Sequence, residues 1–291
     1  MTNFKPYLTL ILGLFAIGFS AIFIRSADAP GTVTAFYRMA IGTALVALPF
    51  LHHIRKRQFR LSRSGVQLAV VGGLLFGSDI AFWTTGITLS GATMPTLMAN
   101  TAPIWVGLGA LFFFQERQNR LFWVGLIVAL FGAALILGQD LTLTAGAGLG
   151  TFLGLLAAFF YGCYYLVAQR GRDHLDTLAY YWIATCSAAV MLGLLNILLG
   201  RPFTGYDTPT YLNFLALGVL GQVFGWLAIT YVQGHLPASI VAPTLLGQPV
   251  VTAVLAVILL GEQFTGWHIA GGVVVLSGVY VVHWSRRGNN E

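Results

Sequence analysis

The sequence predicts an all-α membrane protein of ten transmembrane helices, arranged as two inverted repeats of five helices with both termini in the cytoplasm. Three observations favour this fold class. The 291 residues are 57% hydrophobic and only 8% charged. Apolar runs long enough to cross a bilayer follow one another along the chain. A motif from the first half returns in the second half.

The composition excludes a water-soluble domain. Soluble domains contain about 25% charged residues, whereas this chain contains 8% and has a mean hydropathy of +0.80. A spanning helix needs about 20 apolar residues, so the length leaves room for about ten helices. The first apolar run, 7–24, is interpreted as a helix and not as a signal peptide, because Arg25 and Asp28 follow it in place of a soluble domain.

Charges, prolines and glycine clusters divide the apolar runs into ten predicted helices. Those of the first half span 7–25, 33–51, 66–87, 91–114 and 121–138. Those of the second half span 149–169, 177–199, 210–232, 237–260 and 267–284.

The basic residues orient these helices. With the N-terminus inside, twelve lysines and arginines fall on the cytoplasmic side and two, Arg25 and Arg201, fall outside, which matches the positive-inside bias of membrane proteins. An odd number of helices would place the basic segment 285–291 on the wrong side. The basic excess is therefore a topology signal, and no nucleic-acid partner is expected. We expect a multi-pass protein of the inner (plasma) membrane.

The motif that occurs twice consists of a proline, an acid thirteen residues later, and glycines nine and sixteen residues after the acid. Its first copy is Pro103, Glu116, Gly125 and Gly132, and its second copy is Pro249, Glu262, Gly271 and Gly278. Segments 35–45 and 179–189 also correspond. We therefore divide the chain into repeats 1–140 and 141–291. Because each repeat has five helices, the second must enter the membrane from the opposite face.

Two five-helix copies with this motif resemble the EamA-type members of the drug/metabolite transporter superfamily, over nearly the whole chain. The aromatic-rich helices are most similar to those of the bacterial aromatic amino acid exporters. The resemblance implies a ten-helix basket whose central cavity, lined by helices 1, 3, 4, 6, 8 and 9, works by alternating access. It implies export of amphipathic metabolites, aromatic or other amino acids foremost. Cationic aromatic drugs or other metabolites, a facilitative channel-like pore, and a scaffold or receptor remain the alternatives.

The motif itself is expected to build scaffold. Glu116 and Glu262 each precede a helix, where a carboxylate stabilises the free N–H groups of the first turn. The glycines share one helix face and allow close helix packing. Pro103 and Pro249 are expected to kink helices 4 and 9, because proline removes a backbone donor. Such kinks expose carbonyls that are tolerated in a wet cavity.

Two charges lie inside predicted helices, Arg38 in helix 2 and Asp79 in helix 3. Intramembrane charges are costly and mark functional sites by default. Arg38 either forms an ion pair, snorkels, or contacts a substrate carboxylate. Asp79 either forms a structural pair, binds an amine, or couples transport to protons.

Aromatic and amide side chains complete the predicted cavity. In helix 6, Tyr161 and Tyr165 share one face, and helix 1 offers Phe15 and Phe19 at the same spacing. Indoles stand one turn from polar groups in helices 3 and 8. The full predicted cavity set is Phe15, Phe19, Asp79, Trp83, Asn100, Trp105, Tyr161, Tyr165, Gln222, Trp226 and Gln248.

Neither a nucleotide-driven pump nor an enzyme is predicted, because the phosphate-loop motif and the common hydrolase motifs are missing from the sequence. Cys163 and Cys186 lie inside apolar runs and are interpreted as packing residues. No cofactor or metal is expected. The expected partners are a small-molecule substrate and the lipid bilayer, and a monomer is expected.

Overall fold

The computed structural model describes residues 4–57, 61–90, 93–138, 147–260 and 265–287, and every regular element within these ranges is a helix. The first half contains α1 (Lys5–Ser26), α2 (Gly31–Arg57), α3 (Arg63–Ser90), α4 (Thr93–Ala99), α5 (Ala102–Phe113) and α6 (Arg120–Leu137). The second half contains α7 (Ala147–Arg172), α8 (Thr177–Leu198), α9 (Thr208–Ala216), η2 (Leu217–Trp226), α10 (Leu227–Gln233), α11 (Ala238–Thr244), η3 (Leu245–Gly247), α12 (Gln248–Leu260) and α13 (Gly266–Arg287).

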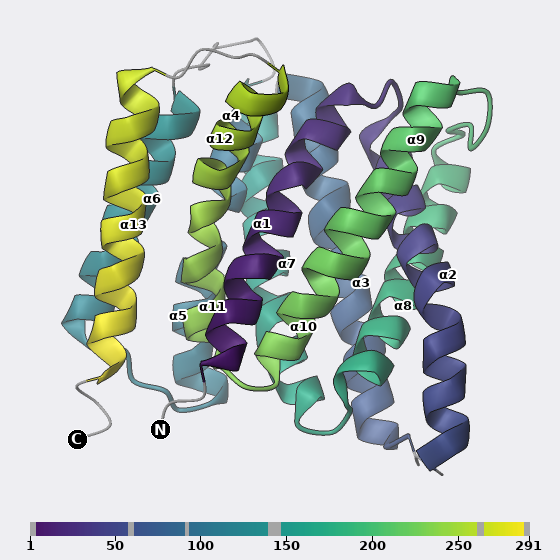
Figure 1. The fold of residues 1–291 in the computed structure, drawn as a ribbon, viewed down its shortest axis with the longest axis horizontal. Coiled ribbons are helices and arrows are strands. Elements are labelled where there is room, and N and C mark those ends of the chain that lie inside the picture. Colours follow the sequence, from purple (N-terminus) through teal and green to yellow (C-terminus); the bar gives the residue numbers. More distant parts are fainter. Residues whose placement is uncertain (1–3, 58–60, 91–92, 139–146, 261–264, 288–291) are drawn as a thin grey trace.

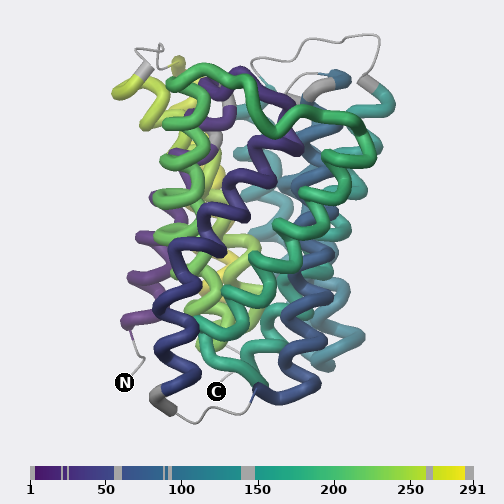
Figure 2. Tube along the Cα trace, turned by 90° about the vertical axis from the view of Figure 1, so that its right-hand side faces the viewer, coloured from purple at the N-terminus to yellow at the C-terminus, as the bar shows by residue number. Residues whose placement is uncertain are grey.

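These elements form one bundle whose helices run along a common axis (Figure 1, Figure 2). Within the described ranges, ten helical segments are long and apolar enough to cross a membrane, which confirms the predicted number. Three of the ten are interrupted: α4 with α5, the run α9–η2–α10, and the run α11–η3–α12.

α1 begins and α13 ends at the same end of the bundle (Figure 1). We call this the terminal end and the opposite one the distal end. A shared end agrees with an even number of crossings. The cytoplasmic location of the terminal end and the inverted relation of the two repeats stay predictions.

Helices of the two halves interlock. The most extensive packing joins α3 to α7, α6 to α13, α3 to α8, and α2 to α8, and each of these pairs takes one helix from either half. A large buried cluster extends across this contact, from Leu10 and Met39 in the first half to Tyr180 and Ile229 in the second. The two repeats of the sequence therefore share one core.

Backbone contact between α6 and α13 explains the spaced glycines. A Cβ at Gly125 would stand 2.8 Å from the carbonyl oxygen of Gly278, and one at Gly132 would stand 2.7 Å from that of Gly271. No side chain fits at such a distance, so the helices approach this closely only because the glycines lack one.

The loop before α6 corrects the expected role of Glu116. The oxygen that caps α6 belongs to Asn119, which accepts a hydrogen bond of 2.9 Å from the Phe122 amide. The Glu116 carboxylate instead accepts a hydrogen bond of 2.9 Å from the Ser239 hydroxyl of α11. Glu116 thus links the two halves at the terminal end. Its counterpart Glu262 lies outside the described residues.

Prolines interrupt two of the membrane-spanning segments. Pro103 stands in the first turn of α5, directly after the break at Asn100 and Thr101. Pro249 stands in the first turn of α12, after a short 3₁₀ segment. Proline suits the first turn of a helix because the amide of that position has no partner in the helix. The first segment is thus divided into α4 and α5, and the second into α11, η3 and α12.

Candidate functional site

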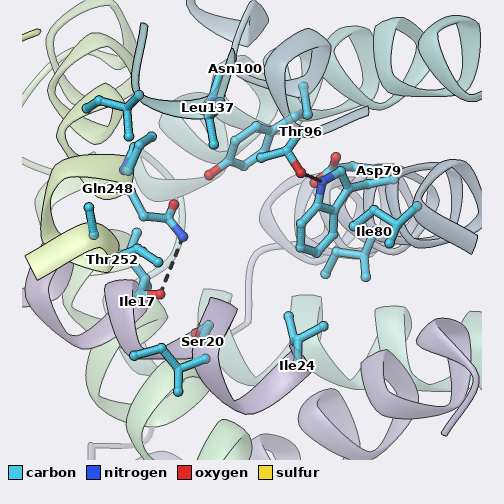
Figure 3. A pocket seen from close by; sticks show the side chains of 18 of the residues that line it. Ile17, Ser20, Ile24, Asp79, Ile80, Thr96, Asn100, Leu137, Gln248 and Thr252 are labelled. Carbon is cyan, nitrogen blue, oxygen red and sulfur yellow. Dashed lines mark hydrogen bonds between the residues drawn. The ribbon is translucent and has the colours of Figure 1, made fainter. Parts of the chain in front are cut away.

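A cavity of about 480 Å³ lies between the two halves (Figure 3). Its walls come from α1, α2, α3, α4 and α6 of the first half and from α7, η2, α12 and α13 of the second. The walls thus include all six of the predicted cavity helices. Most lining residues belong to the distal parts of their helices, from Ile24 near the end of α1 to His268 near the start of α13. The cavity therefore extends from mid-bundle toward the distal end.

Six of the predicted cavity residues line it: Asp79, Trp83, Asn100, Tyr161, Trp226 and Gln248. Arg38 and Pro249 line it as well. Tyr165 and Gln222 stand directly behind the wall, since Tyr165 donates a hydrogen bond of 2.9 Å to the Tyr161 hydroxyl and Gln222 contacts Arg38.

Three predicted residues lie elsewhere. The Phe15 side chain is 51% exposed and the Trp105 side chain 38% exposed, on faces that a bilayer would cover. Phe19 stacks on Phe23 outside the cavity wall. The face of α1 that meets the cavity carries Ile17 and Ser20 instead.

Two opposite charges face the same cavity. Arg38 and Asp79 are each only 7% exposed. Arg38 donates from Nε to Oε1 of Gln222 over 3.0 Å. Neither Arg38 nor Asp79 forms an ion pair within 4.0 Å with any side chain that the structure describes. The site therefore presents a guanidinium and a carboxyl group that are not paired with each other.

Two polar atoms without a hydrogen-bond partner lie near the cavity. Within the described ranges, Nε2 of Gln222 and Oγ of Ser20 are buried and make no hydrogen bond. Ser20 lines the cavity and packs against η2 at Gly221, next to Gln222. Buried polar groups are normally paired, so unpaired ones beside a cavity indicate a place where water or a ligand binds.

Aromatic rings form another part of the cavity wall. Phe76 packs on Trp226 with ring centres 4.4 Å apart, and Tyr161 lies 5.9 Å from the same indole. Trp83 donates from Nε1 to the Thr96 hydroxyl over 3.0 Å (Figure 3), which fixes its ring at the wall.

Tyr164 and Tyr165 extend these rings toward the terminal end and are 3% and 0% exposed. Phe76 stacks on Tyr164 at 4.8 Å, and Tyr165 lies 4.8 Å from Tyr161. We call the group Phe76, Tyr161, Tyr164, Tyr165 and Trp226 the ring plug. It closes the cavity on the side of the terminal end.

Polar side chains of α12 join this helix to α1 at the cavity wall. Gln248 donates from Nε2 to the Ile17 carbonyl over 3.4 Å (Figure 3). Thr252 donates to the Gly18 carbonyl over 3.0 Å. One helix from each half is thus joined by two hydrogen bonds, which would have to break for the halves to move apart here.

Sequence reasoning missed several lining residues, among them Ser20, Phe76, Thr96 and Thr252. One signal could have found Phe76, because it stands one turn before Asp79 and Ile80 on a stripe that continues to Trp83. The π-helical geometry of η2, which carries Gln222 and Trp226, was also missed. π-Helical turns are frequent at functional sites.

Comparisons with known proteins point to one family. A model described as the EamA-like transporter family matches residues 4–138 and again 148–284. A probable amino-acid metabolite efflux pump of Salmonella typhimurium is 29% identical over 60% of this chain and 62% of its own length. The pseudopaline exporter CntI of Pseudomonas aeruginosa is 26% identical over 97% of this chain and 96% of its own length.

A solved crystal structure has the same fold. It superimposes with a TM-score of 0.82 over 98% of this chain and 100% of that one, at 17% sequence identity.

Proposed function

This chain belongs to the EamA-like transporter family, and we propose that it is a secondary transporter that exports amino acids, aromatic ones foremost, by alternating access through the central cavity. The observation that carries the proposal is the joint presence of Arg38, Asp79 and aromatic rings on one cavity. The family and the named relatives are transporters and not enzymes.

The charges suit the two ends of an amino acid. Arg38 uses Nε on Gln222, which leaves the two terminal nitrogens of its guanidinium for a carboxylate. A guanidinium binds a carboxylate through two parallel hydrogen bonds. Asp79, which lacks an ion partner among the described residues, offers a carboxylate to an ammonium group. A zwitterion would neutralise both groups at once.

The remaining wall suits the side chain. Trp83, Phe76 and Trp226 present ring faces and edges, which pack favourably on another aromatic ring. A cavity of about 480 Å³ falls in the range of about 300–1,000 Å³ that small-molecule sites occupy. These features favour an aromatic amino acid over a small polar one.

The shape of the cavity supports alternating access. The cavity extends toward the distal end, and the ring plug closes it on the terminal side. With the termini in the cytoplasm, as the positive-inside bias predicts, this shape corresponds to an outward-facing state. Inverted repeats with a site at their interface are the architecture that supports the opposite, inward-facing state.

A cationic aromatic compound is the second candidate substrate. Asp79 without an ion partner and the surrounding rings would bind such a cation. This substrate would leave Arg38 without a ligand, so we rank it below a zwitterion.

Counterflow in proteoliposomes tests the function. Vesicles loaded with unlabelled phenylalanine should accumulate labelled phenylalanine with saturable kinetics. Excess tryptophan should compete, and phenethylamine or 3-phenylpropionate, which each lack one charge, should compete less. Repeating the assay with a pH gradient reports proton coupling. Non-saturable flux without trans-stimulation would indicate a pore, and competition by phenethylamine alone would favour the cationic substrate.

A further inference from the structure

The buried polar atoms that lack a partner occur on both sides of the ring plug. Among the described residues they are Ser20 Oγ, Gln222 Nε2, Tyr180 Oη and both amide atoms of Gln233. The first two belong to the cavity site. Tyr180 and Gln233 lie on the other side of the ring plug, and the site described above does not use them.

Gln233 ends α10, eleven residues beyond Gln222 on the same membrane-spanning segment. At about 1.5 Å per residue this places it roughly 16 Å closer to the terminal end, where α10 lies in Figure 1. The side chain is 2% exposed. An amide has two donors and two acceptor positions. Within the described ranges, neither amide atom has a hydrogen-bond partner of ordinary length and angle, and the Tyr164 hydroxyl is a polar neighbour of the side chain.

Tyr180 belongs to the same region. It is 0% exposed and its ring fits between two glycines, since a Cβ at Gly72 would collide with its hydroxyl and one at Gly171 with its ring. Tyr164 of the ring plug connects this region to the cavity, because its hydroxyl lies beside Thr230 and Gln233. Arg172 closes the region on the terminal side with a 3.0 Å hydrogen bond to the Thr230 carbonyl.

Burying an amide without a hydrogen-bond partner costs free energy. We expect such an amide where another conformation of the molecule gives it a hydrogen-bond partner. In a transporter that alternates between two openings, the surface hidden beneath the closed side is the surface exposed in the other state. The ring plug is buried on the terminal side of the cavity in this structure, and the Gln233 amide lies beside its member Tyr164.

We propose that Gln233 and Tyr180 form a second polar site on the translocation path, which takes up water and the charged end of the amino acid when the bundle opens toward the terminal end. A neutral amide and a phenol both donate and accept hydrogen bonds. They can therefore receive either an ammonium or a carboxylate group without holding it as tightly as a fixed charge would. The inference rests on the proposed alternating access and on a cargo with a charged end, but the exposure of Gln233 can be measured without knowing which cargo that is.

Thiol labelling tests it without a known substrate. In a background with Cys163→Ala and Cys186→Ala, Gln233→Cys is compared with Val232→Cys, the neighbouring position, whose side chain is 0% exposed. Arg170→Cys, at a side chain that is 64% exposed near the terminal end of α7, identifies the side from which a membrane-impermeant maleimide reaches that end.

From that side, Gln233→Cys should react at least about tenfold faster than Val232→Cys. A tenfold ratio of rates corresponds to a free-energy difference of about one hydrogen bond. Equal rates would overturn the proposal, because Gln233 would then stay buried throughout the cycle. A failure of phenylalanine counterflow in unmodified protein would count against the proposed cargo and leave this result unaffected.

A second variant separates transport from stability. Gln233→Leu removes the unpaired amide and keeps an apolar side chain of similar length, so its melting temperature should equal or exceed that of the parent protein. Its phenylalanine counterflow should fall about tenfold, the equivalent of one lost hydrogen bond. A lower melting temperature, or unchanged counterflow, would show that the amide serves the fold alone and would overturn the proposal.

Discussion

Arg38 and Gln222 stand 184 residues apart and meet through a 3.0 Å hydrogen bond from Nε of the arginine to Oε1 of the amide. The bond joins α2 of the first half to η2 of the second half, so the second half orients the guanidinium that the first half presents to the cavity. Tyr181 adds a second contact, a 2.9 Å hydrogen bond from its hydroxyl to the Gln222 carbonyl.

This relationship predicts the effect of Gln222→Glu. A carboxylate at this position would pair with Arg38 and compete with the carboxylate of the substrate, so the KM for phenylalanine should rise about tenfold or more. Inhibition by phenethylamine, which has no carboxylate, should persist. Gln222→Met is the matched apolar change and should raise KM less. A KM for phenylalanine in Gln222→Glu equal to that of the wild type would show that Arg38 does not bind the carboxylate of the substrate.

Asp79→Asn should separate stability from transport. The buried carboxylate lacks an ion partner among the described residues, and an unpaired buried charge destabilises the fold. Its neutralisation should therefore maintain or raise the melting temperature, whereas phenylalanine counterflow should fall about tenfold, by the value of one charge-assisted hydrogen bond.

Asp207→Asn provides the control for this charge change. Asp207 caps α9 through a 3.0 Å hydrogen bond from the Thr210 amide, far along the segment from the cavity lining. The bonds that its carboxylate receives from the side chain and backbone of Thr210 hold its pKa below the ordinary value. The contribution of Asp207 to stability is thus present at neutral pH and lost on acidification. Counterflow should stay at the wild-type level, and equal losses in both variants would remove the special role of Asp79.

The sequence predicted the fold more completely than the site, for a physical reason. The apolar runs, the basic residues and the spaced prolines and glycines each act locally, so they are visible in a single sequence. The choice of cavity face on a helix is different. In a membrane, the side chains that face lipid are as apolar as those that face the core, so periodicity does not separate the two faces.

Helix 1 illustrates this limit. Phe15 and Phe19 form an aromatic stripe, but the structure directs Phe15 outward and places Ile17 and Ser20 on the cavity. A single serine in an apolar run gives no pattern. By contrast, Asp79 and Trp83 were found because a buried charge is rare in a membrane helix and because a turn of helix brings the indole beside it.

The glycine contacts predict a large effect of Gly132→Leu. The Cβ would stand 2.7 Å from the Gly271 carbonyl and would force α6 and α13 apart. Overpacking of this kind destabilises proteins by about 1–3 kcal/mol, which a lower melting temperature in detergent would report. Gly148→Leu is the matched control, because a Cβ there meets nothing within 4 Å. Equal melting temperatures for the two variants would contradict close packing of α6 on α13.

The hydrogen bond between Ser239 and Glu116 leads to a prediction about what holds the terminal end closed. Their 2.9 Å hydrogen bond joins the loop after α5 to α11, and Gln169 of α7 accepts a 2.6 Å bond from the adjacent Ala238 amide. Ser239→Ala removes the first link and should cost about 0.5–1.5 kcal/mol of stability. If these contacts hold the terminal end shut, the same change should speed maleimide labelling of Gln233→Cys from that end by several-fold, the amount that one such bond is worth. Ser187→Ala, which removes a hydroxyl bonded to the Val70 carbonyl within the bundle, should leave the labelling rate unchanged. An equal acceleration in both variants would mean that general loosening, and not release of this end, exposes Gln233.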